Sequence, residues 1–150
     1  MTGTAGSLRL IPQTGQASGV VSLDAAPANT WVPVPGTDLL LPVAGLYEVT
    51  ADVQGSIGGT GSLTNAIVDA RVFDVTAGAA VPMAERRVIL FTDQSAEPVV
   101  HGVQADASAA ALYQVASPTT VRVEGSWRTD AGATSGRALW AHNFRFKRIA

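Results

Sequence analysis

The sequence predicts an all-β protein, an antiparallel sandwich or barrel of about eight to ten strands. Helical periodicity is nearly absent, because no window places apolar residues at i, i+3, i+4 and i+7 between a cap and a stop. Short alternating runs recur instead, with turn signals roughly every 8–12 residues, as all-β domains require. The 15 glycines and 8 prolines punctuate the whole length and supply those turns.

The clearest strand follows a turn signal at Pro42–Gly45 and alternates strictly. A strand turns successive side chains to opposite sides of the sheet, so one side of this run is expected inside the core. That side carries Tyr47, Val49, Ala51 and Val53, and the opposite side carries Leu46, Glu48, Thr50 and Asp52.

The other expected strands cover residues 20–23, 30–34, 38–41, 66–75, 86–92, 99–109, 119–129 and 137–149. In the last of these, strict alternation places Trp140, His142, Phe144 and Phe146 together on the inner face. Residues 107–111 are rich in alanine, but they lie in a Val-rich alternating run and are therefore assigned to a strand. The glycines of residues 55–62 predict a loop.

The chain of 150 residues fits one domain with a self-sufficient core. Residues 1–19 are rich in Gly, Thr, Ser and Gln, and only Leu8, Leu10 and Ile11 could anchor them. This segment is expected to form an N-terminal arm or a loosely attached edge, followed by the main domain over residues 20–150.

Charge and composition exclude several classes of function. Charged residues make up 15% of the chain and the net charge is -2, so no basic footprint for nucleic acid exists. No secretion signal begins the sequence and no run approaches 18 apolar residues, so we expect a soluble product without a membrane partner. The low charge favours a surface that partners cover.

The sequence offers little catalytic chemistry. There is no cysteine, His101 and His142 are the only histidines, and no Gly-x-Ser-x-Gly elbow occurs. Asp69 and Asp74 flank an expected strand, and no Asp-x-Asp-x-Asp calcium run occurs. The aspartates near expected turns, where they bind backbone donors, are Asp24, Asp38, Asp93, Asp106 and Asp130. We therefore expect no enzyme activity, no metal and no cofactor. A small enzyme or a sugar-binding barrel is a further hypothesis from another class. Trp31, Trp127 and Trp140 could form a carbohydrate platform, although tryptophans in strands more often belong to the core.

Residues 41–49, Leu-Pro-Val-Ala-Gly-Leu-Tyr-Glu-Val, resemble the signature of the complement globular-head and tumour-necrosis-factor-like jelly roll, matched at Gly45, Tyr47 and Val49. The likeness covers residues 20–150, and its form with Pro-Val-Ala-Gly-Leu-Tyr is similar to versions in tailed-bacteriophage structural proteins. It implies an antiparallel jelly-roll sandwich that forms three-fold trimers, with the sheet of the Gly-x-Tyr strand facing the axis. Trp127 and Phe144 are expected in the same core as Tyr47 and Val49.

Apolar residues on the second face of these strands suggest a subunit interface, because a sandwich buries only one face of each sheet. In 137–149, Leu139 and Ala141 are expected to point opposite Trp140 and Phe144, on the face away from the core. The small basic cluster Arg145–Arg148 could pair with carboxylates on a neighbour. The predicted interface comprises Leu46, Glu48, Leu139, Ala141 and Arg145.

These observations lead to a non-enzymatic phage structural protein as the expected function. The leading form is a homotrimeric capsid decoration protein on the outer head surface of the virion, made in the bacterial cytoplasm. Its arm residues Leu8, Arg9, Leu10 and Ile11 would dock on the shell of the major capsid protein. The alternative is a tail-fibre or head-fibre tip that binds host carbohydrate or protein through loops 55–65 and 93–98.

Overall fold

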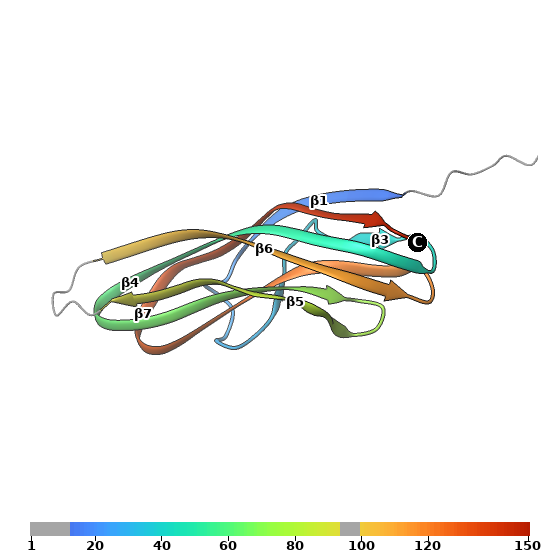
Figure 1. Cartoon of the computed structure of the whole chain (residues 1–150). Coiled ribbons are helices and arrows are strands. Elements are labelled where there is room, and N and C mark those ends of the chain that lie inside the picture. The colour runs from blue at the N-terminus through green and yellow to red at the C-terminus, as the bar shows by residue number, and fades with distance from the viewer. Residues whose placement is uncertain (1–12, 94–99) are drawn as a thin grey trace, which may run out of the picture.

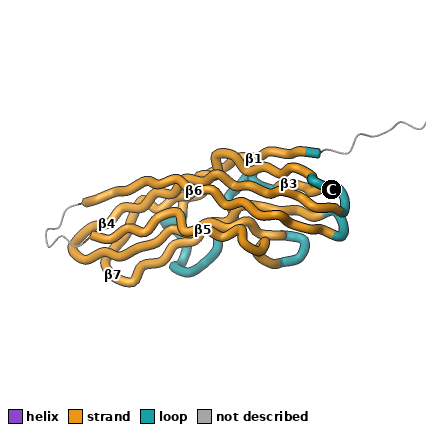
Figure 2. Tube along the Cα trace, viewed as in Figure 1, coloured by secondary structure: helices purple, strands orange, loops and turns teal. Residues whose placement is uncertain are grey.

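The computed structural model describes residues 13–93 and 100–150. Every element in this part of the chain is a strand, and turns and loops join the strands (Figures 1 and 2). No helix long and apolar enough to cross a membrane occurs among these residues. The strands are β1 (Thr14–Ser22), β2 (Val32–Pro33), β3 (Leu39–Leu41), β4 (Gly45–Asp74), β5 (Ala79–Asp93), β6 (Val100–Val115) and β7 (Thr119–Arg148).

Two long strands, β4 and β7, form the centre of the fold. They pair antiparallel along their length, from Tyr47 opposite Arg148 to Asp74 opposite Val121. The resulting ribbon bends back on itself near Asn65 and Ala131, as the hairpin-like returns in Figure 1 show. Each long strand therefore contributes one segment to each of two layers, which gives nine strands in all.

Sheet 1 contains β1, residues 133–148 of β7, residues 45–60 of β4, and β6, in that order. Sheet 2 contains β2 and β3, residues 119–131 of β7, residues 65–74 of β4, and β5. All these pairings are antiparallel, and the buried aliphatic and aromatic side chains of both sheets form one core. The predicted all-β jelly-roll sandwich is confirmed.

The signature strand lies at the centre of sheet 1. Tyr47 and Val49 are fully buried, and the Tyr47 hydroxyl donates a 2.9 Å hydrogen bond to the carbonyl oxygen of Val43. Gly45 has a φ of 156°, and a Cβ there would collide with the carbonyl oxygen of Ala150. That oxygen also accepts a 2.7 Å hydrogen bond from the Leu46 amide. Glycine is therefore needed where the chain end packs on the start of β4.

The expected loop over residues 55–65 is wrong for its first part. Residues 55–60 pair on both sides, with β6 and with β7. A Cβ on Gly55 would lie 3.0 Å from Cγ1 of Val88 and 3.1 Å from Cδ1 of Ile89 in the opposite sheet. The glycine therefore lets β5 approach the inner face of β4, although glycine clusters usually indicate a turn.

Part of the expected arm belongs to the sandwich. Residues 14–19 lie in β1, which pairs with the end of β7 and forms the edge of sheet 1. The carbonyl oxygen of Gln13 accepts a 2.7 Å hydrogen bond from the Arg148 amide. Residues 1–12, including the proposed docking residues Leu8, Arg9, Leu10 and Ile11, lie outside the described part of the chain.

Candidate assembly face

The outward side of sheet 1 carries both apolar and charged side chains, as the sequence predicted for this sheet. Val20 of β1 lies opposite Trp140 of β7, and Leu112 of β6 lies opposite Glu48 of β4. Val20 is 50% exposed and Leu112 is 65% exposed, while Leu46 and Trp140 are half-buried. We call this surface the sheet 1 face, and its main side chains are Val20, Leu46, Glu48, Asp52, Leu112, Trp140, Arg145 and Lys147.

Asp52 organises the polar centre of the sheet 1 face. Its Oδ1 accepts a 2.7 Å hydrogen bond from the Ser108 hydroxyl, and its Oδ2 accepts one of 2.5 Å from Nη1 of Arg145. These hydrogen bonds, first that of Arg145 and then that of Ser108, hold the pKa of Asp52 below its usual value. The carboxylate thus connects β4 to both neighbouring strands.

A shallow depression of about 340 Å³ lies between β1, β7 and β4 on this face. Glu48, Arg145 and Lys147 supply charges of both signs at its wall, and Thr14, Gln16 and Thr50 supply neutral polar groups. No group of three or more His, Cys, Asp or Glu residues within the described ranges could hold a metal ion. The chemistry of this depression suits contact with another protein surface of mixed charge.

Only three of the five predicted interface residues lie on the sheet 1 face. Leu46 points outward and is half-buried, Glu48 is exposed, and Arg145 is exposed and paired with Asp52. The outward orientation predicted for Leu139 and Ala141 is wrong, because both are buried in the core.

A β-bulge causes this error. The register between β4 and β7 shifts where Asp52 pairs with Asn143 and Val53 pairs with Ala141. The extra residue, His142, moves the side chains before it to the opposite faces. Leu139, Ala141, Phe144 and Phe146 therefore all point inward, whereas Trp140 and His142 point outward. The prediction assumed strict alternation through the bulge, and it therefore did not place Trp140 on the surface.

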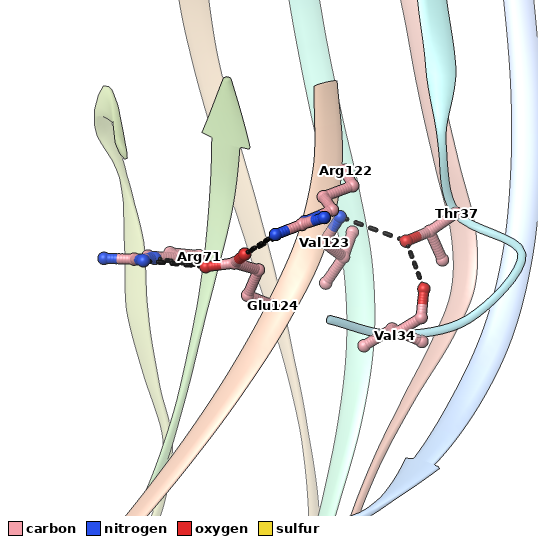
Figure 3. Close-up of polar contacts among 6 residues, drawn as sticks. All are labelled: Val34, Thr37, Arg71, Arg122, Val123 and Glu124. Atoms are coloured by element: carbon pink, nitrogen blue, oxygen red, sulfur yellow. Dashed lines mark hydrogen bonds and ion pairs between the residues drawn. The ribbon is translucent and has the colours of Figure 1, made fainter. Parts of the chain in front are cut away.

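The centre of the outward side of sheet 2 is occupied by interactions within the chain, whereas Leu40 and Leu90 on this sheet are exposed. Glu124 is 3% exposed and accepts hydrogen bonds from two arginines, one on each carboxylate oxygen, as Figure 3 shows. Arg71 reaches Oε2 at 2.7 Å and Arg122 reaches Oε1 at 2.7 Å. Arg71 also stacks 4.3 Å from the ring centre of Trp31 and 4.7 Å from that of Phe73. These contacts leave the three charges well satisfied without a partner molecule.

Beside this cluster, Thr37 connects the segment that follows β2 to β7 (Figure 3). Its hydroxyl donates a 2.7 Å hydrogen bond to the Val34 carbonyl and accepts one of 3.1 Å from the Val123 amide. Nearby, burial raises the pKa of Asp69, while Arg128 and Arg87 act in the opposite direction. This side of the molecule is thus braced from within.

Two of the three tryptophans have a ring face covered by an arginine. Arg71 stacks on Trp31, and the Arg137 guanidinium lies 3.7 Å from the ring centre of Trp127. The indole N–H of Trp127 donates a 3.0 Å hydrogen bond to the Ala26 carbonyl, which fixes the half-buried ring against the core. Trp31 and Trp127 lie in sheet 2 or beside it and Trp140 lies in sheet 1, so the three do not form one platform.

No protein-family model and no curated protein matches this sequence. Among solved structures, the globular domain of a zebrafish complement 1qA protein is similar at 15% identity and a TM-score of 0.43, over 90% of this chain and 96% of that one. Eiger TNF from S. frugiperda matches at 13% identity and a TM-score of 0.36, over 91% and 92% of the two chains. A structure of infectious bursal disease virus, Gx strain, matches at 10% identity and 0.41, over 93% of this chain and 37% of that chain.

These matches describe a general likeness in shape, and the strand pairing of the chain itself defines its fold class. The described residues form a nine-stranded antiparallel jelly-roll sandwich. The outward side of sheet 2 has a buried carboxylate held by two arginines, and it exposes Leu40 and Leu90. The sheet 1 face exposes Val20 and Leu112 around the ion pair of Asp52 with Arg145.

Proposed function

We propose that this protein is a non-enzymatic assembly module that forms a homotrimer through its sheet 1 face. The observation that carries the proposal is the placement of Val20, Leu46, Leu112 and Trp140 on the outward side of one sheet. A sandwich needs apolar side chains on only one side of each sheet, so a second apolar set favours an interface. A closed three-fold ring would cover this face on every subunit.

The polar groups of the sheet 1 face fit the same interpretation. Asp52 and Arg145 already pair within the chain, so their charges carry a smaller desolvation cost when a neighbour covers them. Glu48 and Lys147 lie opposite each other in the register of β4 and β7, and both side chains are exposed. Their opposite charges are therefore available for contacts with a neighbouring subunit.

The role in a virion is the second part of the proposal. It is supported by the resemblance of residues 41–49 to the form of the signature in tailed-phage structural proteins and by the low charged fraction of 15%. In this proposal the trimer sits on the outer capsid surface of a phage made in the bacterial cytoplasm. Residues 1–12 dock it on the major capsid protein, and neither nucleic acid nor a membrane takes part.

A matched pair of leucine substitutions tests the trimer. Leu112→Lys places a charge on the sheet 1 face, whereas Leu90→Lys places the same charge at a similarly exposed leucine of β5 in sheet 2. Native mass spectrometry should find a trimer for the wild type and for Leu90→Lys, and loss of the three-fold species for Leu112→Lys. A wild type that stays monomeric at micromolar concentration would contradict the proposed trimer.

The virion role needs its own experiment. Cryo-electron microscopy of the parent particle should find this protein in stoichiometric amounts over the shell. Deletion of residues 1–12, which leaves β1 intact, should abolish docking while the trimer persists. Density confined to the tail or to a fibre tip would replace decoration with the receptor-binding alternative.

A further inference from the structure

The free edge of β6 is the least protected strand edge in the described part of the molecule. β6 spans 16 residues, and its ladder with β4 runs without a register shift from Val115 opposite Gly45 to Val100 opposite Thr60. Its sequence holds no proline, lysine or arginine, and Asp106 is its single carboxylate. A long regular edge presents a row of backbone donors and acceptors that another strand can pair with.

The other edge strands carry the devices that usually prevent such pairing. β1 has a bulge between Ala17 and Gly19, and β5 contains Pro82, two register shifts and the charged run Glu85–Arg87. β2 and β3 contain two and three residues. Proline, bulges, charges and short length all discourage pairing between edges, and β6 has none of these devices except the single charge of Asp106.

A second observation concerns the side chains of β6 that face the core. Val103, Ala105, Ala107, Ala111 and Tyr113 pack against the core but remain only partly buried. β5 lies beside this edge in the other sheet, yet β6 pairs with β4 alone among the described strands. The open side of the sandwich therefore exposes apolar surface that an added strand would cover.

We infer that the free edge of β6 pairs with β6 of a second copy of this chain, antiparallel and about a two-fold axis. The sequence of β6 is compatible with itself in this arrangement. With the axis at Ser108, each Asp106 lies opposite Ala110 of the second copy, so the carboxylates do not face each other. Residues of equal parity meet, so inward side chains join inward ones and sheet 1 continues across both copies.

The small residues at the middle of β6 leave room for the side chains of a second copy. Residues 107–111 are Ala-Ser-Ala-Ala-Ala, and their side chains point to the two faces of the sheet, where they would not clash with their counterparts across the pair. The inference concerns the backbone edge and does not depend on the three-fold assembly proposed above, which uses the outward side chains. Together the two contacts would link trimers into larger arrays, in which each two-fold contact joins two trimers.

Single cysteines test the pairing, because the wild-type chain has none. Gln104→Cys, Asp106→Cys, Ser108→Cys and Ala110→Cys place thiols at exposed positions along β6, and Ser18→Cys in β1 is the control. Directly opposed residues of an antiparallel pair lie about 4.5–5.5 Å apart, which suits a disulfide. Oxidation should cross-link one β6 variant roughly tenfold or more faster than the control, because pairing raises the effective thiol concentration. The cross-linking rate should be lower for the cysteine variants on either side of that position in β6.

Amide hydrogen exchange separates this edge from any contact through the sheet 1 face. In an unpaired edge strand every second amide points away from β4 and exchanges quickly, whereas a paired edge protects both sets. Protection of consecutive β6 amides, together with the cross-linking peak, supports the inference. Alternating fast amides overturn the inference, and so does cross-linking no faster than that of Ser18→Cys. The second result also covers an edge that binds a strand of another protein instead of a second copy.

Discussion

The hydroxyl of Tyr113 in β6 donates a 2.6 Å hydrogen bond to Oδ2 of Asp74 in β4 and so joins the two sheets at their open side. Asp74 is 3% exposed, and its other oxygen accepts a 2.7 Å hydrogen bond from the Ala77 amide in the turn before β5. One buried carboxylate thus holds a turn of sheet 2 and an edge strand of sheet 1.

Replacement of Tyr113 by phenylalanine should destabilise the protein by about 1–3 kcal/mol, because Asp74 then loses a donor in a buried site. Urea denaturation measures this free energy. The double variant Tyr113→Phe with Asp74→Asn should lose less than the sum of the two single variants, as expected for residues in contact. Additive losses would contradict direct coupling.

Alkaline pH should weaken the same contact. Burial, followed by the hydrogen bond with Asp74, raises the pKa of Tyr113 to about 12 from its ordinary value of 10.0. A raised pKa in the folded state stabilises the fold fully below the unfolded value, and this contribution is lost as the pH rises through about 12. The free energies of unfolding of the wild type and Tyr113→Phe should therefore converge as the pH rises between these two pKa values. A constant difference across this range would argue against the assignment.

Glu124→Gln should cost up to about 3–5 kcal/mol, since it removes the buried charge between two arginines and leaves both without their carboxylate. The Arg71 and Arg122 side chains are 18% and 25% exposed, so water can partly solvate their charges after the substitution. The expected loss of stability therefore lies near or below the lower end of that range. Asp38→Asn at an exposed position is the control, with a change within about 0.5 kcal/mol. Equal denaturation midpoints for the two variants would contradict the bracing role of Glu124.

Arg145→Gln should raise the pKa of Asp52 toward its ordinary value, because the hydrogen bond from Arg145 is the main cause of the lowered pKa. A carboxyl group with a lowered folded-state pKa stabilises the fold above its unfolded pKa, and acid removes that contribution as the pH falls through the folded value. NMR titration of the Asp52 carboxyl carbon measures the shift. Arg86→Gln in β5 should leave it unchanged.

Gly55→Ala should destabilise the sandwich by about 1–3 kcal/mol, because the new methyl group meets Val88 and Ile89 of the opposite sheet. Gly102→Ala in β6 is the matched control, since the nearest atom to its Cβ is the Ile57 carbonyl oxygen at 4.0 Å. Thermal unfolding compares the two variants. A Gly55→Ala protein as stable as the control would mean that the sheets can separate at this end without loss.

The sequence was sufficient to predict the fold class, because in most strands apolar and polar residues alternate and this pattern can be recognised in each segment by itself. The run from Leu46 to Val53 has the predicted faces, and Tyr47 and Val49 are buried in the core. Two of the sequence predictions were wrong for local structural reasons that the residue types do not reveal. Gly55 packs within a sheet where glycine usually signals a turn, and the bulge at His142 reverses the faces of the strand before it.

The candidate site was less accessible to sequence reasoning than the fold. The second apolar face was inferred from Leu46, but its other members come from strands that meet only after folding, such as Val20 beside Trp140. The internal pairing of Asp52 with Arg145 joins strands far apart in the chain and has no local pattern. A shift in periodicity between Trp140 and Phe144 was the signal that could have revealed Trp140.

The bent ribbon of β4 and β7 has a consequence for biosynthesis. Tyr47 pairs with Arg148, and Thr14 pairs with Lys147, so central and edge contacts of sheet 1 cannot form until residues 147 and 148 have been made. Contacts so distant along the chain slow folding and give early segments no partner. We therefore expect the nascent chain to stay unfolded on the ribosome and to fold only after its C-terminal strand emerges from the exit tunnel.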